Sequence, residues 1–193
     1  MRAQIAWIKV AVFILALVPL GRLVTGVIAG TLGANPIEAI ARSTGTWTLS
    51  FLLITLGVTP LRMLSGWNWL LRLRRMLGLY AFFYAVLHFI TYVWLDQFFD
   101  FGAMVKDVIK RPFITVGFAC FLLLLPLAAT STGAMVKRLG AKNWLALHRL
   151  AYAAGVGGVV HYWWLVKRDI TGPAIYAAVL VALLGLRLLH YAR

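Results

Sequence analysis

The chain has 193 residues, of which 63% are hydrophobic and only 12% are charged. This composition excludes an ordinary soluble domain and is typical of an integral membrane protein. The formal net charge of +14 at pH 7 would also suit a nucleic-acid-binding protein, so the distribution of the charges along the chain has to decide between the two classes.

Six apolar runs are candidates for crossing a hydrocarbon core of about 30 Å. Lys9 interrupts the first run and no clear cleavage site follows it, so we expect a retained helix rather than a secretory signal. The sequence therefore predicts one domain over residues 1–193: an all-α integral membrane protein built as a six-transmembrane-helix bundle. In chain order the six runs cover residues 5–24, 46–61, 76–95, 113–130, 145–166 and 173–190.

The charge distribution predicts how this bundle is oriented. With six spans and the N-terminus in the cytoplasm, twelve of the 19 Lys and Arg residues fall on the inner side, and seven fall on the outer side with all five acidic residues. Lys and Arg concentrate in the cytoplasmic loops of membrane proteins, so we expect both termini in the cytoplasm. Topology and attraction to anionic membrane lipids then account for the positive charge, and we expect no nucleic-acid partner.

Two outer segments between the runs carry local signals. Asn35-Pro36 is a turn signal, and Pro36 followed by IEAIAR predicts a short surface helix. The loop after the third run, DQFFDFGAMVKDVIKRP, mixes aromatic and charged residues, which is typical of a segment along the membrane interface. The sequence contains no phosphate-binding loop and no G-x-G-x-x-G after a strand pattern.

His88 and His161 are the strongest candidates for a functional site, because ionisable residues inside a span usually face the bundle interior. His88 lies eight residues before Asp96 in the third run, and His161 lies six residues before Lys167 in the fifth. Both runs cross from inside to outside, so the two imidazoles are expected at one depth within about one helical turn. Such a pair can bind one iron axially from both sides, as in b-type haem proteins. An interhelical hydrogen bond or a polar cavity would be the structural alternative.

His148 lies near the inner end of the fifth run, about 20 Å from His161 along a helix. It is a candidate ligand for a second haem, although thirteen residues place it about 140° from His161 around an ideal helix, so one haem-facing stripe needs a local distortion or a strong tilt of the helix. The matching depth on the third run is occupied by Arg74, which cannot ligate iron but can pair with a propionate or a phosphate. His190 is the remaining histidine and is more often an interfacial side chain.

Three glycines precede His161, and two interpretations of them stay open. Gly155, Gly157 and Gly158 could let a flat macrocycle approach the backbone, or they could allow close helix packing through small residues. The single cysteine, Cys120, excludes an intramolecular disulfide and suits apolar packing. The sequence lacks C-x-x-C-H, so any haem would be held without thioether bonds.

Four stretches together resemble one known family: GANPIEAIARSTG, TLGVTPLR, RRMLGLYAFFYAVLH and NWLALHRLAYAAGVGGVVHYWW. Over nearly its whole length the chain is similar to the MsrQ family of haem-binding membrane subunits, within the ferric reductase-like transmembrane proteins. The resemblance implies a bacterial inner-membrane subunit with haem b, one or two per chain, and with FMN. It also implies that a cytoplasmic flavin reductase or the quinol pool supplies electrons, and that a periplasmic molybdopterin methionine sulfoxide reductase, MsrP, receives them to repair oxidised proteins.

By the same resemblance, His88, His148 and His161 are the haem histidines. The larger oxidases of the family carry two histidines on the third span, and here Arg74 replaces the inner one. No flavin motif is visible, and Arg74 and Arg75, with Arg72, are the cationic residues suited to a cofactor phosphate; the topology rule also accounts for them. We expect an electron-transfer subunit rather than a complete enzyme. Two alternatives remain: a stand-alone haem b metal (ferric) reductase, and a haem-free transporter or membrane assembly factor.

Overall fold

The computed structural model describes residues 2–166 and 168–191, with the backbone alone for Arg2 and Tyr191. All regular structure in these ranges is helical, as the composition predicts. The helices are α1 (Arg2–Ile28), α2 (Pro36–Ser65), a 3₁₀ turn (Asn68–Leu70), α3 (Leu71–Ile90) with a π-helical end (Thr91–Asp96), α4 (Phe101–Lys110), α5 (Pro112–Ala129), α6 (Gly133–Leu139), α7 (Ala141–His148), α8 (Leu150–Leu165) and α9 (Thr171–Tyr191).

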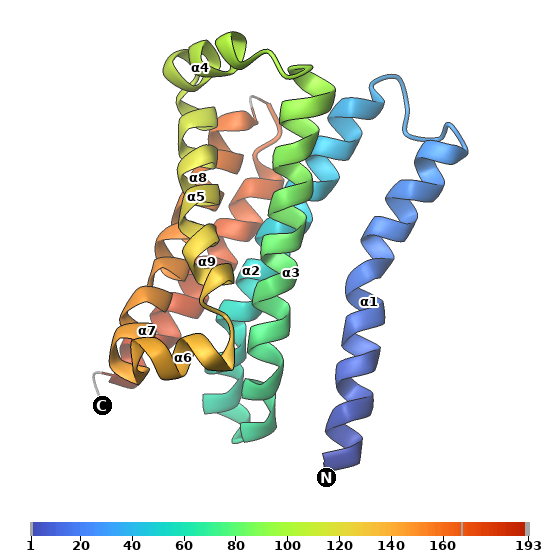
Figure 1. Cartoon of the computed structure of the whole chain (residues 1–193). Helices are drawn as coiled ribbons and strands as arrows, with labels where there is room; N and C mark the ends of the chain where they lie inside the picture. Colours follow the sequence, from blue (N-terminus) through green and yellow to red (C-terminus); the bar gives the residue numbers. More distant parts are fainter. Residues whose placement is uncertain (1, 167, 192–193) are drawn as a thin grey trace.

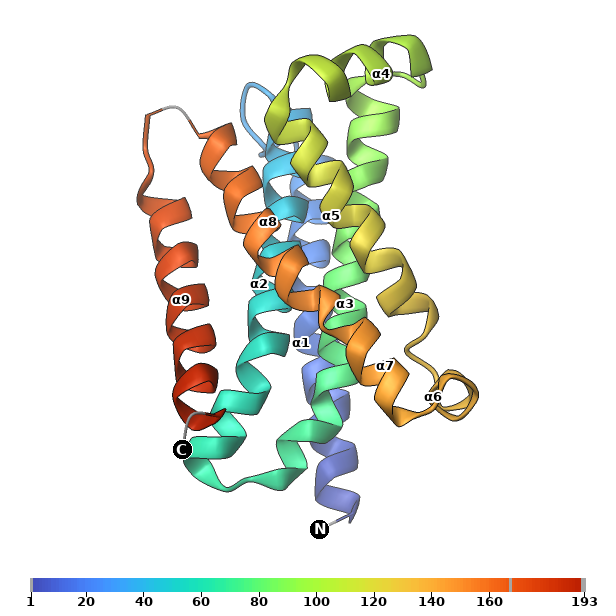
Figure 2. The same cartoon turned by 90° about the vertical axis from the view of Figure 1, so that its left-hand side faces the viewer.

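The longer helices run side by side, and the shorter ones close the two ends of the bundle. Figure 1 shows α4 lying across one end, between α3 and α5, whereas α6 and α7 lie at the other end. α1 begins and α9 ends at the α6–α7 end (Figure 1). α3 and α8 run in the same direction, as the depth argument for His88 and His161 requires (Figure 2).

Five helical segments are long and apolar enough to cross a membrane: Ala3–Ile28, Pro36–Ser65, Asn68–Asp96, Pro112–Ala129 and Thr171–His190. They contain five of the six predicted runs. The other predicted run, residues 145–166, is divided at Arg149 between α7 and α8, and α8 has only 16 residues. The described chain is therefore an all-helical protein with five candidate membrane spans.

The short surface helix that we expected after Pro36 is not a separate element. Pro36 is instead the first residue of α2, whose 30 residues continue through the second apolar run. Asn35 caps this helix, because its side-chain oxygen accepts a hydrogen bond from the Glu38 N–H at 3.2 Å. No strong helix breaker separates the surface turns from the apolar run, so one helix forms. The expected interfacial segment contains α4, which has no buried residue.

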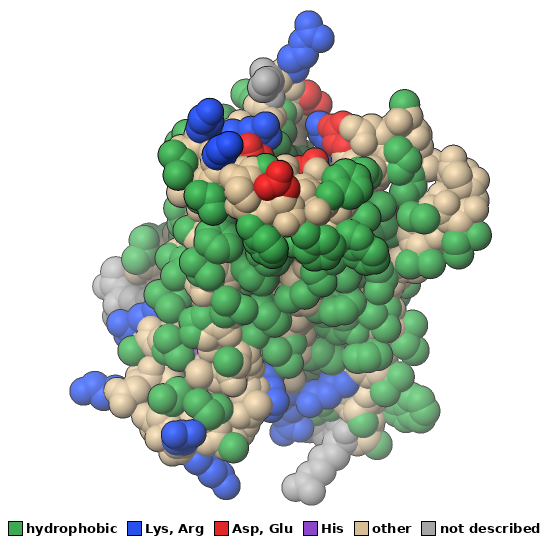
Figure 3. Space-filling model, turned by 45° about the horizontal axis from the view of Figure 1, so that its top comes forward, with side chains coloured by type: hydrophobic (Ala, Val, Ile, Leu, Met, Phe, Trp, Pro, Cys, Tyr) green, Lys and Arg blue, Asp and Glu red, His purple; other side chains and the backbone are tan. Residues whose placement is uncertain are grey.

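Side chains of different character occupy different levels of the bundle. Figure 3 shows a broad hydrophobic band below a cap that contains the acidic side chains, with Lys and Arg at both ends. Large apolar side chains are also exposed on α9, where Val181 is 70% and Leu188 is 71% exposed. Such an apolar surface is suited to lipid rather than to water. Among the basic residues counted above, Lys167, Arg193 and the side chain of Arg2 lie outside the described residues.

Packing divides the core helices into two pairs. α2 packs most extensively against α3, and α5 against α8, whereas contacts between the two pairs are fewer. Aromatic residues bridge the pairs where α3 meets α5, with the rings of Phe89 and Phe121 stacked at a centroid distance of 4.5 Å. A ligand bound between the two pairs would therefore disrupt fewer helix–helix contacts than a ligand bound within either pair.

α1 stands apart from the other helices in Figure 1 and is held by tyrosines of α3. The buried Tyr84 hydroxyl donates to the Ala16 carbonyl at 2.8 Å and accepts from the Leu20 N–H at 3.2 Å. These two backbone groups pair with each other in a regular helix, so Tyr84 bridges α1 beside Pro19, where the helix lacks one N–H donor. Tyr80 adds a hydrogen bond to the Phe13 carbonyl at 3.0 Å.

Candidate functional site

His88 lies near the end of α3 and points toward the first turns of α2. Its Nδ1 atom is 3.0 Å from the carbonyl oxygen of Ala41 and 3.4 Å from the hydroxyl of Thr44. Because a carbonyl only accepts, the contact with Ala41 requires a proton on Nδ1. The neutral ring then has its free lone pair on Nε2, which is the atom available to a metal.

His161 is held in the same way on the other helix pair. It lies on α8, and its Nδ1 atom is 2.6 Å from the carbonyl oxygen of Phe113 in the first turn of α5. The same reasoning places a proton on Nδ1 and leaves Nε2 unprotonated. A backbone carbonyl that accepts from the second ring nitrogen is the usual support of a metal-binding histidine, because it fixes both the tautomer and the orientation of the ring.

The two imidazoles lie next to each other, as their predicted depth requires. Their ring centroids are 6.2 Å apart, with an angle of 76° between the ring planes. Two imidazoles that bind one metal from opposite sides, with each nitrogen about 2 Å from it, have centroids roughly 6 Å apart. The centroid separation is therefore the one expected for a metal held by one histidine from each helix pair. Groups of three or more metal-ligating side chains are absent from the described residues, so the fit is to a two-ligand centre.

Gly45 and Gly117 make room for these two rings, and the sequence reasoning missed them. A Cβ atom at Gly45 of α2 would lie 3.1 Å from Cε1 of His88. A Cβ atom at Gly117 of α5 would lie 2.7 Å from Nδ1 of His161, closer than real Cβ contacts allow. A glycine inside a helix lowers helix stability by about 1 kcal/mol relative to alanine. An unfavourable glycine at each position was the only sign in the sequence that these positions have a special role.

The three glycines before His161 serve helix packing. A Cβ at Gly155 would lie 3.2 Å from Leu56 of α2, and one at Gly158 would lie 3.1 Å from Leu49 of the same helix. A Cβ at Gly157 would clash with the sulfur of Cys120 in α5. Of the two interpretations that the sequence left open, close helix packing accounts for all three positions.

His148 is the last residue of α7, where the helix breaks. The helix is interrupted at Arg149, between His148 and His161. The ring of Trp144 stacks on His148 at 3.9 Å between centroids, and Nε2 of His148 is 3.1 Å from the hydroxyl of Thr130. Arg74 is close enough to His148 for an electrostatic interaction, in agreement with the depth match predicted from the sequence.

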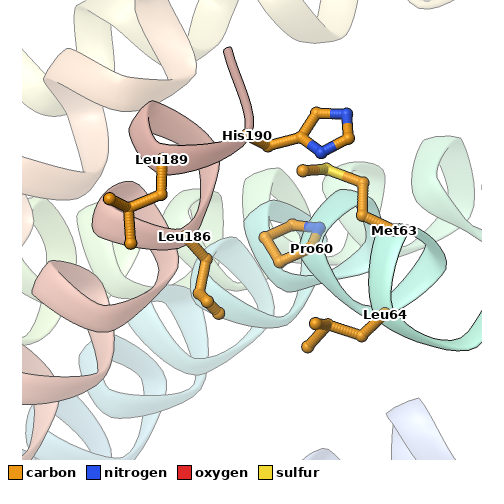
Figure 4. Close-up of a pocket in the computed structure, with 6 residues that line it drawn as sticks. All are labelled: Pro60, Met63, Leu64, Leu186, Leu189 and His190. Atoms are coloured by element: carbon orange, nitrogen blue, oxygen red, sulfur yellow. The ribbon is translucent and has the colours of Figure 1, made fainter. Parts of the chain in front are cut away.

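The other predicted residues do not join this inner site. Arg74 is partly buried, whereas Arg75 is exposed at the start of α3, so the two arginines do not present one common surface. His190 lines a separate cavity of about 300 Å³ between α2 and α9, next to Met63 and Pro60 (Figure 4). Figure 2 shows the end of α9 on the opposite side of the bundle from α7. Among the described histidines, none is therefore placed as a partner for His148.

Comparisons with known proteins identify relatives of the whole chain. Residues 44–159 match the family described as "Ferric reductase like transmembrane component". A protein from Herminiimonas arsenicoxydans is 58% identical over 95% of this chain and 85% of its own length, and one from Azospira oryzae is 56% identical over 98% and 82%. A protein from Rhodospirillum rubrum is 54% identical over 96% of this chain and 89% of its own length. All three are named "Protein-methionine-sulfoxide reductase heme-binding subunit MsrQ".

Proposed function

The chain belongs to the ferric reductase-like transmembrane family and to its MsrQ group, and from this premise we propose that it is the haem b subunit of a membrane electron-transfer system. In this role it carries electrons across the bacterial inner membrane to a periplasmic molybdopterin methionine sulfoxide reductase, MsrP, which repairs oxidised proteins. A cytoplasmic flavin reductase or the quinol pool is the donor. The observation that carries the proposal is the His88–His161 pair, whose centroids are 6.2 Å apart and whose Nδ1 atoms both face backbone carbonyls.

His88 and His161 would hold the haem between the two helix pairs, whose mutual contacts are fewer than those within either pair. Bound haem supplies one-electron chemistry at its iron. The chain's own residues fix the two imidazoles: the Ala41 carbonyl orients His88, the Phe113 carbonyl orients His161, and the apolar bundle excludes water. This support is preorganised, because the hydrogen bonds come from backbone groups in helical turns that do not rotate as side chains do.

The proposed topology has six crossings, with both termini in the cytoplasm. At 1.5 Å per residue, the 16 residues of α8 rise about 24 Å, and the last turn of α7 adds to this length at the inner end. The helices that start and finish the described chain share the α6–α7 end (Figure 1). All five acidic residues lie at or beside the α4 end, in the first turn of α2, the end of α3, α4 and the turn before α9. Acidic residues contribute little to orientation, but Lys and Arg are more numerous toward the α6–α7 end, and this bias supports a periplasmic α4.

We extend the proposal to a second haem at the inner end. His148 provides its iron ligand, and the guanidinium of Arg74 is suited to a haem propionate. The electrostatic interaction between these two residues, at the end of the bundle where α7 lies, supports this assignment. FMN enters the proposal only through the family resemblance, with Arg75 as an exposed cation suited to its phosphate.

Haem content measured on purified variants tests the ligand assignment without any partner protein. We expect His88→Ala and His161→Ala each to remove the same low-spin b-type signal from the reduced-minus-oxidised spectrum. His190→Ala is the matched control, since its imidazole lines a different cavity, and it should keep the wild-type spectrum. His148→Ala should lower haem content while the signal of the outer pair remains.

Two results would favour the other functions. A colourless wild-type preparation from cells well supplied with haem would support a haem-free transporter or assembly factor. Reduction of a ferric chelate at the outer face, as fast without the periplasmic enzyme as methionine sulfoxide reduction with it, would support a metal reductase.

A further inference from the structure

A cavity of about 450 Å³ lies between α1 and α2, at the end of the bundle where α4 lies. Residues of both helices and of the turn between them line it, and the hydrogen bonds from Tyr80 and Tyr84 of α3 hold α1 on its other side. Pro19 and Leu15 line it. Because Pro19 has no backbone N–H, the carbonyl of Leu15, four residues earlier, lacks its usual helical hydrogen bond. In Figure 1, α1 is visibly separated from its neighbours along this side. The volume falls within the range of small-molecule sites in proteins.

The cavity has an apolar wall and polar side chains that can donate hydrogen bonds. Leu15, Val18 and Leu23 of α1 provide the apolar wall, whereas Arg22 of α1 and Ser43 of α2 provide hydrogen-bond donors. The only ion pairs among the described residues are Glu38–Arg42 and Asp107–Arg111, so Arg22 has no acidic partner there. The side chain of Ser43 likewise has no hydrogen-bond partner within the described chain.

We propose that this cavity binds one anionic phospholipid. The phosphodiester pairs with the guanidinium of Arg22 and accepts a hydrogen bond from Ser43, and an acyl chain lies along Leu15 and Val18. Arg22 is six residues from the end of α1 at Ile28, or about 9 Å along the helix, a depth from which an arginine reaches the headgroup level. A zwitterionic lipid such as phosphatidylcholine brings its own cation beside the phosphodiester, and a quinone brings no anion, so the unpaired charge of Arg22 favours a headgroup with a net negative charge.

The site adjoins the turns of α2 that hold His88. Ser43 and Trp47 line the cavity, while Ala41, Thr44 and Gly45 of the same turns contact the His88 ring. A lipid bound on one side of α2 would therefore stabilise the turns whose other side orients the His88 ring. The lipid site does not depend on the proposed electron-transfer role, because its contacts involve neither histidine.

Lipid retained by the purified protein tests this proposal. The full chain is purified in mild detergent, offered phosphatidylglycerol or phosphatidylcholine, and analysed by native mass spectrometry. We expect the wild type to retain one phosphatidylglycerol, and Arg22→Gln to weaken its binding about ten-fold, the scale of one charge-assisted pair. Arg42→Gln is the matched control, since it removes an outer arginine that is already paired with Glu38, and it should bind as the wild type does.

Val18→Trp separates the cavity from general attraction to charge, because it fills the apolar wall and keeps Arg22. We expect it to abolish retention, with unchanged elution in size-exclusion chromatography showing that the variant is folded. The proposal is overturned if Arg22→Gln or Val18→Trp retains phosphatidylglycerol as the wild type does, if phosphatidylcholine binds equally well, or if the retained molecule is a quinone.

Discussion

The guanidinium of Arg187 in α9 donates a hydrogen bond to the carbonyl oxygen of Leu56 in α2, at 2.5 Å. In a regular helix this carbonyl would accept from the residue four positions later, which is Pro60 and has no N–H. Arg187 also donates to the hydroxyl of Tyr152 in α8 and lies 5.1 Å from the centroid of its ring. The Arg187 side chain thus connects α9, α2 and α8 where Pro60 removes one backbone hydrogen bond from α2.

Replacing Arg187 should destabilise the bundle. Arg187→Met leaves the Leu56 carbonyl without a donor in an apolar region, which we expect to cost about 1–3 kcal/mol of unfolding free energy. Thermal unfolding in detergent measures the loss. Arg138→Met in α6 removes an exposed arginine and should change stability by less than about 0.5 kcal/mol. Equal melting temperatures for the two variants would show that the Leu56 contact contributes nothing.

Adding a methyl group beside the paired histidines should disturb haem binding in a graded way. Gly117→Ala places a Cβ 2.7 Å from His161, and Gly45→Ala places one 3.1 Å from His88. We expect Gly117→Ala to lower haem content and to shift the low-spin electron paramagnetic resonance signal more than Gly45→Ala does, because its contact is the tighter one.

Gly185→Ala is the matched control for these two variants. Nothing lies within 4 Å of a Cβ at this position in α9, and alanine favours a helix by about 1 kcal/mol over glycine. The control should bind haem as the wild type does and unfold at an equal or higher temperature. A Gly117→Ala protein with the wild-type spectrum would contradict the packing role assigned to that glycine.

Removing the Tyr84 hydroxyl should loosen α1. Tyr84→Phe loses a buried donor and acceptor that bridge Ala16 and Leu20, so we expect a cost of about 1–3 kcal/mol and faster proteolysis of the loop between α1 and α2. Tyr80→Phe removes one hydrogen bond, to Phe13, and should have a smaller effect. The prediction fails if the Tyr84 variant is as resistant to unfolding and to protease as the wild type.

The two arginines predicted to bind a cofactor should differ in their effect on the second haem that we propose near His148. Arg74→Gln removes a positive charge that interacts with His148. Because a nearby cation stabilises the reduced form, the potential of the inner haem should fall, by roughly 60 mV for each 1.4 kcal/mol of lost interaction. Arg75→Gln changes an exposed side chain and should leave the potential almost unchanged. Spectroelectrochemical titration measures both, and equal shifts would remove Arg74 from the site.

The sequence was a poorer guide to local irregularities than to the main helices. The turn signal at Pro36 was correct, but the helix that begins there continues to Ser65 instead of ending on the surface. The fifth apolar run reads as one helix in the sequence, whereas the structure interrupts it at Arg149. At Pro36 the surface residues and the apolar run lack a strong breaker between them and form one helix, whereas the apolar pattern of the fifth run carries no sign of the break at Arg149.

By itself, the sequence determined the helical membrane class, five candidate spans and the common depth of His88 and His161. These properties are local, since hydropathy follows from composition and depth follows from the fixed rise of 1.5 Å per residue. Only the tertiary structure decided which carbonyls hold the two imidazoles, that Gly45 and Gly117 make room for them, and that Arg187 supports α2 at Pro60. These contacts depend on how each helix is rotated and paired, and that is set by the packing of side chains far apart in the chain.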